Sequence, residues 1–441
     1  MFKVIHSPKA TRKERISWYF YDFGNSAYAA VVLLAVYSAY FQGTVVGGAE
    51  GSRLWGIALG IAMLFVAITS PILGTIADFS KLKKRVLFIY TIVCCIATAG
   101  LFFVQAGDIF LGMLLFIIAE FAYRGSQVFY NALLTDIATP EEMGHVSGNG
   151  WAIGSAGGVV CLLIVLVLIQ TIGGAFIVRT SFIITAIFFF LSTLPLFFWL
   201  KEKGEGSPLP EGETILSIAF KRLWATFKEV RNYKQYLKFI IAYLIYNDGI
   251  IMTMNFAAIL GAVLYGMEQQ QLIIFMILVQ ITSVIGAFLF GNLSDHFGGK
   301  LSLIISLVLM IGTIGWMMVN YSLTAFYVIG GLAGFALTGV QSVSRTMVGQ
   351  LAPEEKSAEF YGFFAMAGRS SSFIGPTLYG IIAAESALYF ERNGLTKLLA
   401  EQSGQRIALV TIIGFLIVGL IILISVNLKK SAQETQTLQT K

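Results

Sequence analysis

Five charged residues stand inside long apolar stretches of this 441-residue chain: Asp22, Glu120, Arg124, Asp248 and Arg369. A charge at the centre of a membrane-spanning helix costs about 2.5–3.5 kcal/mol on insertion scales, so it needs a partner or a function. A buried carboxyl can carry a proton, and a guanidinium can hold a carboxylate through two parallel hydrogen bonds. These residues therefore predict a site for a proton and a charged solute.

Among the acids, Asp248 is the preferred proton carrier. It follows Asn247 and lies about 16 Å into an apolar stretch, at 1.5 Å per helical residue, which is near the membrane midplane. Asp22, with Asn25 three residues later, is a second candidate and lies nearer the cytoplasm. For Asp22 and Asp248 the alternative is a hydrogen-bonded acid that stabilises a contact between helices.

Glu120 and Arg124 are four residues apart with the acid first, which is the favourable order for a pair on one helix face. Two interpretations stay open, a structural salt bridge or a charge pair that rearranges with a coupling ion. Arg369, in the run GRSSS, suits capture of a substrate carboxylate, and its alternative is pairing with a buried acid. Near the inner ends of two stretches, four residues are gate candidates: Tyr130, Asn131, Gln341 and Arg345.

The elements that carry these residues are apolar windows too numerous for a water-soluble fold. Hydrophobic residues make up 57% and charged residues 12% of the chain, against roughly 45–50% and 25% in soluble domains. Most windows reach the roughly 20 residues that a spanning helix needs, and none alternates as a barrel strand would. We expect twelve transmembrane helices, at 18–41, 54–77, 86–106, 109–134, 147–170, 176–200, 237–262, 270–290, 301–319, 323–347, 358–383 and 406–428.

Two copies of one loop indicate an internal duplication. GTIADFSKLKKR starts at Gly74 and GNLSDHFGGK at Gly291, and their aspartates, Asp78 and Asp295, are 217 residues apart. A second pair, ATPEEMGHVSG and LAPEEKSAEFYG, follows windows four and ten. We expect the glycines to admit a close helix neighbour, the aspartates to face a helix N-terminus, and Arg85 to anchor the cytoplasmic end.

The duplication divides the chain into two six-helix halves, with a transport site between them. The expected parts are an N-terminal bundle over 1–200, a cytoplasmic linker with an amphipathic helix over 201–236, a C-terminal bundle over 237–428 and a disordered tail over 429–441. Of 30 Lys and Arg, 23 fall on the side of both termini and five on the other, so both termini are predicted to be cytoplasmic. Spaced small residues, Gly150, Gly154 and Gly158, predict close helix packing.

Signals of catalysis are missing from the sequence. It has three histidines and three cysteines, without HExxH, CxxC or GxxxxGK[ST] patterns. We therefore expect no enzyme activity, no metal site, no cofactor and no nucleic-acid partner.

Several strings resemble the major facilitator superfamily, in the branch of the autophagy-related vacuolar amino-acid effluxer and its bacterial permease relatives. They are WYFYDFGNSAY, VFYNALLTDIA, SGNGWAIGSAGG, YLIYNDGI and QSVSRTMVGQLAPEEKSAEFYGF, which together extend from Trp18 to Phe363. Relatives often have Lys where this chain has Arg369, and Leu-Pro where it has Leu134-Thr135. The resemblance implies solute transport, with spans one, four, seven and ten lining the cavity.

We expect a secondary active transporter that moves a small polar or zwitterionic solute by alternating access. The solute class is amino acids, moved in the export direction, and the coupling ion is a proton. The protein is expected to be a monomer in the plasma membrane. The alternatives are a lipid or lysolipid translocase, a non-transporting membrane sensor or scaffold, and an enzyme acting on membrane lipids.

Overall fold

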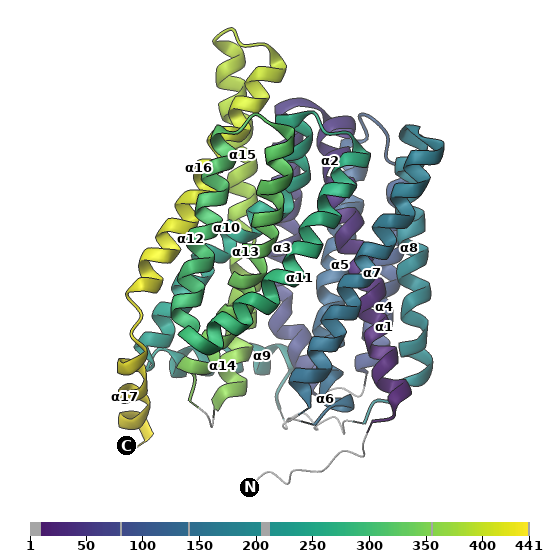
Figure 1. Cartoon of the computed structure of the whole chain (residues 1–441). Helices are drawn as coiled ribbons and strands as arrows, with labels where there is room; N and C mark the ends of the chain where they lie inside the picture. Colours follow the sequence, from purple (N-terminus) through teal and green to yellow (C-terminus); the bar gives the residue numbers. More distant parts are fainter. Residues whose placement is uncertain (1–9, 80–81, 140–141, 204–211, 354–355, 440–441) are drawn as a thin grey trace. The chain divides into compact units, whose positions relative to one another are not determined.

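The computed structural model describes residues 10–79, 82–139, 142–203, 212–353 and 356–439, and every regular element within these ranges is a helix. Twelve helical stretches are long and apolar enough to cross a membrane. Each overlaps one predicted window, so the all-α membrane fold is confirmed (Figure 1). The α-helices of these stretches are α1 Arg12–Tyr28, α2 Tyr37–Tyr40, α3 Gly48–Phe79, α4 Lys83–Gly100, α5 Ile109–Ala132, α6 Leu134–Ile137, α7 Met143–Ile172, α8 Gly174–Trp199, α10 Lys234–Tyr265, α11 Gln269–Phe297, α12 Gly299–Val319, α13 Leu323–Leu351, α14 Ser357–Ser371, α15 Ile374–Arg392 and α16 Lys397–Ile424.

The first helix begins earlier than its hydrophobicity indicates because a capping box fixes its start. Thr11 Oγ1 accepts a hydrogen bond from Glu14 N at 3.3 Å, and Glu14 Oε2 accepts one from Thr11 N at 2.7 Å. This reciprocal pair satisfies backbone donors that a helix start otherwise leaves open. The helix therefore includes polar residues that a window based on hydrophobicity leaves out.

The first and the eleventh spans are not continuous α-helices. The first passes through two π-helical segments, Ala29–Ala35 and Phe41–Val46. The eleventh is broken between α14 and α15, where Ser372 Oγ donates to Gly368 O at 2.6 Å. Single π turns inside α-helices often occur at functional sites. Neither interruption has a proline or a charge at its start that would have revealed it in the sequence.

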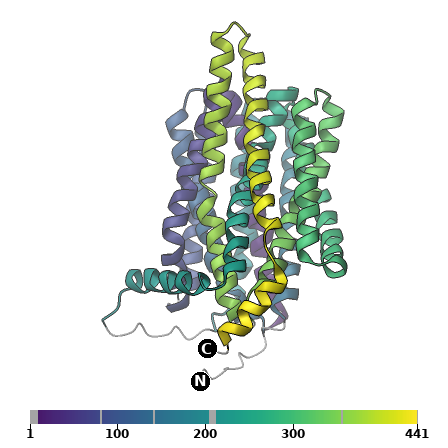
Figure 2. The same cartoon turned by 90° about the vertical axis from the view of Figure 1, so that its left-hand side faces the viewer.

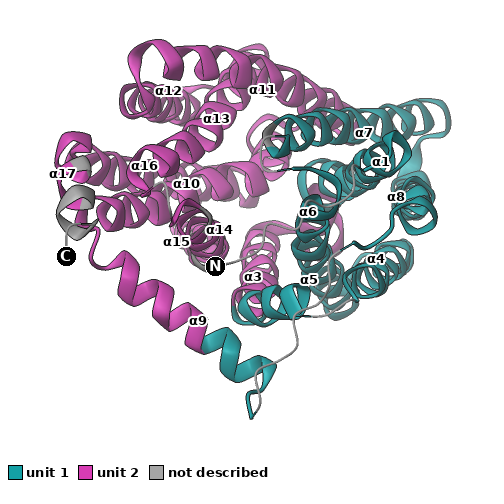
Figure 3. Ribbon diagram, turned by 90° about the horizontal axis from the view of Figure 1, so that it is seen from below, with its two compact units in different colours: residues 1–37, 68–220 teal, residues 38–67, 221–441 magenta. Residues whose placement is uncertain are grey.

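The chain clusters into two compact units, coloured separately in Figure 3. Unit 1 comprises residues 1–37 and 68–220, and unit 2 comprises residues 38–67 and 221–441. Residues 38–67 belong to unit 2 through contacts such as the hydrogen bond from Trp55 Nε1 to Asn255 O at 3.0 Å. The first part of α3 thus packs with helices that follow it by some 200 residues.

Each unit repeats one capping interaction, which supports the internal duplication. In unit 1, Lys84 Nζ donates to Leu200 O at 2.7 Å, just after the end of α8. In unit 2, Lys300 Nζ donates to Ile424 O at 2.8 Å and Val426 O at 2.6 Å, at the end of α16. In both units the lysine opens a span after a repeated loop and satisfies carbonyls that the helix end leaves open.

The repeated glycines do not hold a close helix neighbour in this structure, contrary to expectation. A Cβ added to Gly74 or to Gly291 would meet no atom within 4 Å. Asp78 and Asp295 are exposed in the last turns of α3 and α11, and Asp295 forms no hydrogen bond or ion pair with the described residues. Ser80 and Lys81 of the first loop lie outside the described residues, as do Pro140, Glu141, Glu354 and Glu355 of the second repeated pair.

Helix α9, Ile215–Val230, lies in the segment where the sequence predicts an amphipathic helix. Its last ten residues belong to unit 2 and run crosswise to the long helices of that unit (Figure 2). Glu229 pairs with Lys356, which raises the pKa of the Lys356 ammonium above its usual value. This ion pair ties the end of α9 to the start of α14.

The tail differs from the disorder expected from its polar composition. Residues 428–439 form helix α17, Leu428–Gln439. Gln235 connects it to α10, because Gln235 N donates to Glu434 Oε2 at 3.2 Å and Gln235 Oε1 accepts from Asn427 N at 2.8 Å. Asn427 Oδ1 also accepts from Lys430 N at 3.1 Å, as a helix-capping side chain does.

Candidate functional site

Helix α5 carries a line of polar residues through an otherwise apolar span. Glu120, Arg124, Gln127 and Asn131 follow one another at intervals of four, three and four residues, which places them on one helix face. A different face exposes large apolar side chains, at Phe110, Leu114 and Ile118. Lipid suits the second face, and the polar face is the one that points into the protein.

Glu120 and Arg124 form the ion pair that their spacing predicts. Arg124 Nε donates to Glu120 Oε1 at 2.8 Å. Glu120 is 0% exposed, whereas the Arg124 side chain is 29% exposed and its guanidinium lies 5.3 Å from the centre of the Tyr123 ring. The carboxylate is therefore enclosed, and the guanidinium extends from it toward accessible space.

A tyrosine of α1 lies beside this pair. Tyr28 acts electrostatically on Glu120 and Arg124, and its ring is 4.7 Å from that of Tyr123. Glu120 Oε2, Tyr28 Oη and Asn25 Oδ1 are enclosed atoms that form no hydrogen bond of ordinary geometry with a described residue. An enclosed polar atom without such a bond costs about 1–3 kcal/mol, so it needs a structural or functional reason.

Asp22 lies between α1 and α7 and interacts with Asn25. A Cβ added to Gly154 would overlap the Asp22 carboxylate, and one added to Gly150 would overlap the Trp18 ring. The predicted close packing at these two glycines is thereby confirmed. Asp22 approaches α7 because glycine stands opposite it.

The gate candidates Tyr130 and Asn131 have different surroundings. Tyr130 is buried and stacks on Trp18 at 4.3 Å and on Tyr21 at 5.1 Å between ring centres. Trp18 Nε1 also donates to Tyr130 O at 3.0 Å. Asn131 is exposed. The aromatic cluster fixes α1 against α5 and so positions the charges one to three turns away.

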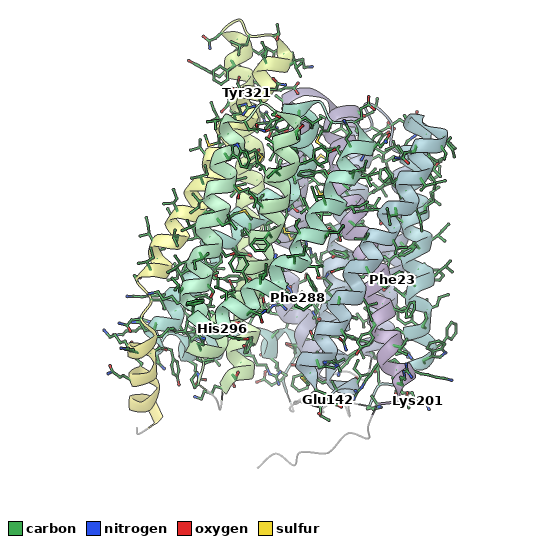
Figure 4. The ribbon with its side chains drawn as sticks, viewed as in Figure 1. Phe23, Glu142, Lys201, Phe288, His296 and Tyr321 are labelled. Carbon is green, nitrogen blue, oxygen red and sulfur yellow. The ribbon has the colours of Figure 1, made fainter. Side chains whose placement is uncertain are left out.

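Charged side chains pair at the end of unit 1 where α1 begins. Arg15 pairs with Glu142 at 2.5 Å and donates from Nε to Ile137 O at 3.2 Å. Lys83 pairs with Asp136 at 3.5 Å. Figure 4 shows Glu142 and Lys201 at the end of unit 1 where α1 begins.

In unit 2, Asp248 and Asn247 lie in the middle of α10. Asp248 is 2% exposed and packs where α15 begins, since a Cβ added to Gly375 would lie 3.1 Å from Asp248 Cβ. Asn247 Nδ2 donates to Gly368 O at 3.5 Å, next to the break between α14 and α15. The two residues thus contact α15 and α14 respectively.

Arg369 and Arg345 lie on different helices, α14 and α13, and both act electrostatically on Tyr243. Tyr243 in turn packs on Phe364 at 4.2 Å between ring centres. Gln341 and Arg345 are exposed one turn apart on α13, and the Arg345 carbonyl accepts from Tyr361 Oη at 3.0 Å. The structure therefore gathers the predicted cations of unit 2 around one tyrosine.

Sequence analysis missed the aromatic and amide groups beside the charges. Tyr28, Tyr123 and Gln127 were not singled out, although Gln127 stands seven residues after Glu120 on the same helix face. A search for polar residues at helical spacing from a buried charge would have found Gln127. Nothing in the sequence distinguishes Tyr28 from the other 17 tyrosines.

In the part of the chain that the structure describes, no group of three His, Cys, Asp or Glu could hold a metal ion. The three cysteines, Cys94, Cys95 and Cys161, are free and buried. They pack as small apolar side chains.

A sequence profile of the family described as "Vacuole effluxer Atg22 like" matches residues 55–436 of this chain. The chain belongs to this family. The match begins near the start of the second span and continues past the twelfth, so it includes both copies of the repeated loop.

Related proteins agree with this assignment. The uncharacterized MFS-type transporter YxiO of Bacillus subtilis (strain 168) is 28% identical over 386 residues, which are 85% of this chain and 89% of YxiO. The autophagy-related protein 22-1 of Aspergillus niger is 28% identical over 259 residues, which are 54% of this chain and 42% of that protein. This chain therefore matches less than half of the length of the fungal relative.

Solved structures show the same fold at low sequence identity. A bacterial homologue of the human lysosomal transporter Spinster superposes with a TM-score of 0.72 at 16% identity, covering 96% of both chains. A mutant of the nucleoside transporter NupG has a TM-score of 0.71 at 15% identity, covering 94% of this chain and 99% of that one. The fold is that of the major facilitator superfamily, as the resemblance implied.

The Atg22-like protein is an integral multi-pass membrane protein and a transporter of the major facilitator type, not an enzyme. A small-molecule substrate follows from that class. The predicted family, fold and transporter class are thereby confirmed.

Proposed function

We propose that this protein is a proton-coupled secondary transporter that exports a small polar or zwitterionic solute, of the amino-acid class, by alternating access. The observation that carries the proposal is the ion pair of Glu120 and Arg124 inside a spanning helix, with the carboxylate enclosed and the arginine side chain partly exposed. Such charges inside a membrane protein mark substrate or ion pathways. The family description as an effluxer supports the export direction.

The proposed substrate and proton residues are Asp22, Asn25, Glu120, Arg124, Asn247, Asp248 and Arg369. The proposed inner gate is formed by Tyr130, Asn131, Gln341 and Arg345. We place the protein in the plasma membrane as a monomer, with both termini in the cytoplasm. The excess of Lys and Arg on that side, 23 of 30, supports this orientation.

Purified full-length protein in liposomes tests the proposal. Vesicles preloaded with the twenty protein amino acids are diluted into amino-acid-free buffer, with and without a pH gradient, and efflux is measured by mass spectrometry. We expect protein-dependent efflux of a subset of the amino acids that a proton gradient accelerates. Movement of fluorescent phospholipid between leaflets without amino-acid flux would instead identify a lipid translocase.

A further inference from the structure

Arg124 is anchored through one of its three guanidinium nitrogens. Nε donates to Glu120 Oε1 at 2.8 Å, and neither Nη atom forms a hydrogen bond to a described residue. Neither Nη atom is among the enclosed polar atoms that lack partners, so neither is fully enclosed. The guanidinium therefore presents its outer edge, with two parallel donors, while Glu120 holds its inner edge.

The open edge belongs to the polar face of α5. Arg124 shares this face with Gln127 and Asn131, and the large exposed apolar side chains Leu114 and Ile118 lie on a different face. The Tyr123 ring supports the cation at 5.3 Å. A solute that approaches the polar face of α5 would meet the guanidinium.

We infer that Arg124 binds the carboxylate of a zwitterionic solute through its two Nη atoms, and that Glu120 is the positioning residue that fixes the guanidinium for this contact. A planar guanidinium matches a carboxylate with two parallel hydrogen bonds. The inference rests on the proposed transport of amino acids and names the residue that recognises the acid group. Sequence analysis had assigned that role to Arg369.

Two oxygen atoms beside the pair suit the other end of such a solute. Glu120 Oε2 and Tyr28 Oη lie next to each other, and neither forms a hydrogen bond of ordinary geometry with a described residue. An ammonium group supplies up to three donors. These atoms are enclosed here, so a movement of α1 against α5 must precede that contact.

Chemical protection of Arg124 tests the inference without requiring transport. The full-length protein in liposomes is treated with phenylglyoxal, which modifies accessible guanidinium groups, and modification is measured on the α5 peptide. The protectants are the twenty protein amino acids, the C-terminal amides of those that protect, and inorganic phosphate. We expect amino acids to slow modification of Arg124 at least threefold, and amides and phosphate to leave it unchanged.

The rate at Arg179 is the internal control, because its guanidinium lies over the Phe102 ring at 5.6 Å and outside the polar face of α5. Equal protection by the amides, protection by phosphate alone, or no protection by amino acids would each overturn the assignment of a carboxylate to Arg124.

Variants separate positioning from a purely structural role. In Glu120→Gln the cation remains but loses its charged anchor, so we expect the apparent KM for amino-acid flux to rise tenfold or more with little change in maximal rate. Arg124→Lys should raise KM at least as much, and Arg179→Lys should leave it unchanged. Thermal unfolding of each variant in detergent shows whether it is folded. If a variant does not fold, the protection experiment on the wild type decides.

The two proposals fail in different ways. Protection of Arg124 without any amino-acid flux would support the carboxylate site and contradict the proposed transport. Amino-acid flux with an unprotected Arg124, and with KM unchanged in folded Glu120→Gln and Arg124→Lys, would leave transport standing and remove this inference.

Discussion

The buried acids of the two units have different surroundings, and this difference predicts different roles. Glu120 is paired with a cation at 2.8 Å, so its charge is balanced inside the protein. Asp248 is 2% exposed and packs against the start of α15. A buried carboxyl takes up a proton more readily than an exposed one, because burial disfavours its charged form.

Asp248→Asn should therefore abolish the effect of a pH gradient on efflux while exchange without a gradient continues. The amide has nearly the same shape as the acid but carries no proton. The measurement is amino-acid flux in liposomes at two values of the pH gradient. Asp295→Asn is the matched control, since Asp295 is exposed at the end of α11. Wild-type pH dependence in Asp248→Asn would assign proton coupling elsewhere.

At the level of the element, the two ends of α3 differ in how tightly they pack. A Cβ added to Gly56 would overlap Pro376 O and lie 3.2 Å from Gly380 Cα, whereas one added to Gly74 would meet nothing within 4 Å. Nearby, Gln405 Nε2 donates to Ser52 Oγ at 2.7 Å, and Gln405 Oε1 accepts from Tyr379 Oη at 2.9 Å. The N-terminal part of α3 is thus fixed to α15 and α16 of unit 2.

Gly56→Ala should lower the thermal unfolding midpoint in detergent by several degrees. Overpacking of a close contact costs about 1–3 kcal/mol, because backbone atoms must separate. Gly74→Ala, on the same helix, should leave the midpoint unchanged or raise it, since alanine is favoured over glycine in helices by up to about 1 kcal/mol. Equal midpoints for the two variants would show that α3 is free of α15 in the membrane-extracted protein.

Helix α9 presents an apolar stripe that no described element covers completely. Leu216, Phe220, Trp224 and Phe227 are exposed at helical spacing, and Lys221, Arg222 and Lys228 stand beside them. Apolar side chains bordered by basic ones suit the interface of an anionic bilayer. The sequence predicted an amphipathic helix in this segment, and its contact with the membrane stays a prediction.

An environment-sensitive fluorophore on α9 measures that contact. A label on Trp224→Cys should show blue-shifted emission and be quenched by spin-labelled lipid in liposomes containing phosphatidylglycerol. A label on Lys221→Cys should remain in water. The three native cysteines are buried, so they compete little for the label. If labels at both positions show the emission typical of an aqueous environment, α9 does not contact the membrane.

At the level of the whole molecule, the sequence predicted what depends on length and composition. The twelve hydrophobic windows correspond to twelve helical stretches, because a segment that spans lipid must be both apolar and helical. The spacing of Glu120 and Arg124 predicted their ion pair because both lie on one continuous helix. These predictions needed only local information.

Contacts between distant segments could not be read in the same way. The glycines of the repeated loops were assigned close packing, yet the close contacts occur at Gly56, Gly154 and Gly380, which pack on other helices. The sequence does not show which helix lies opposite each of these glycines. The role of Tyr28 was hidden for the same reason, because its neighbours Glu120 and Tyr123 are on α5.

The sequence also predicts how the protein is oriented in the membrane. Tyr321, between α12 and α13, is 79% exposed, and His296, near the end of α11, is also exposed. Figure 4 shows them toward opposite ends of unit 2. The excess of Lys and Arg places the His296 end in the cytoplasm.

A membrane-impermeant maleimide should therefore label Tyr321→Cys in intact cells and His296→Cys only after the cells are permeabilised. The buried native cysteines provide a low background, and the unsubstituted protein measures it. Because an even number of spans precedes His296 and an odd number precedes Tyr321, the same experiment fixes the side of the N-terminus. Labelling of His296→Cys in intact cells would place the N-terminus and the basic loops outside the cell. The orientation assumed in the proposed export would then be reversed.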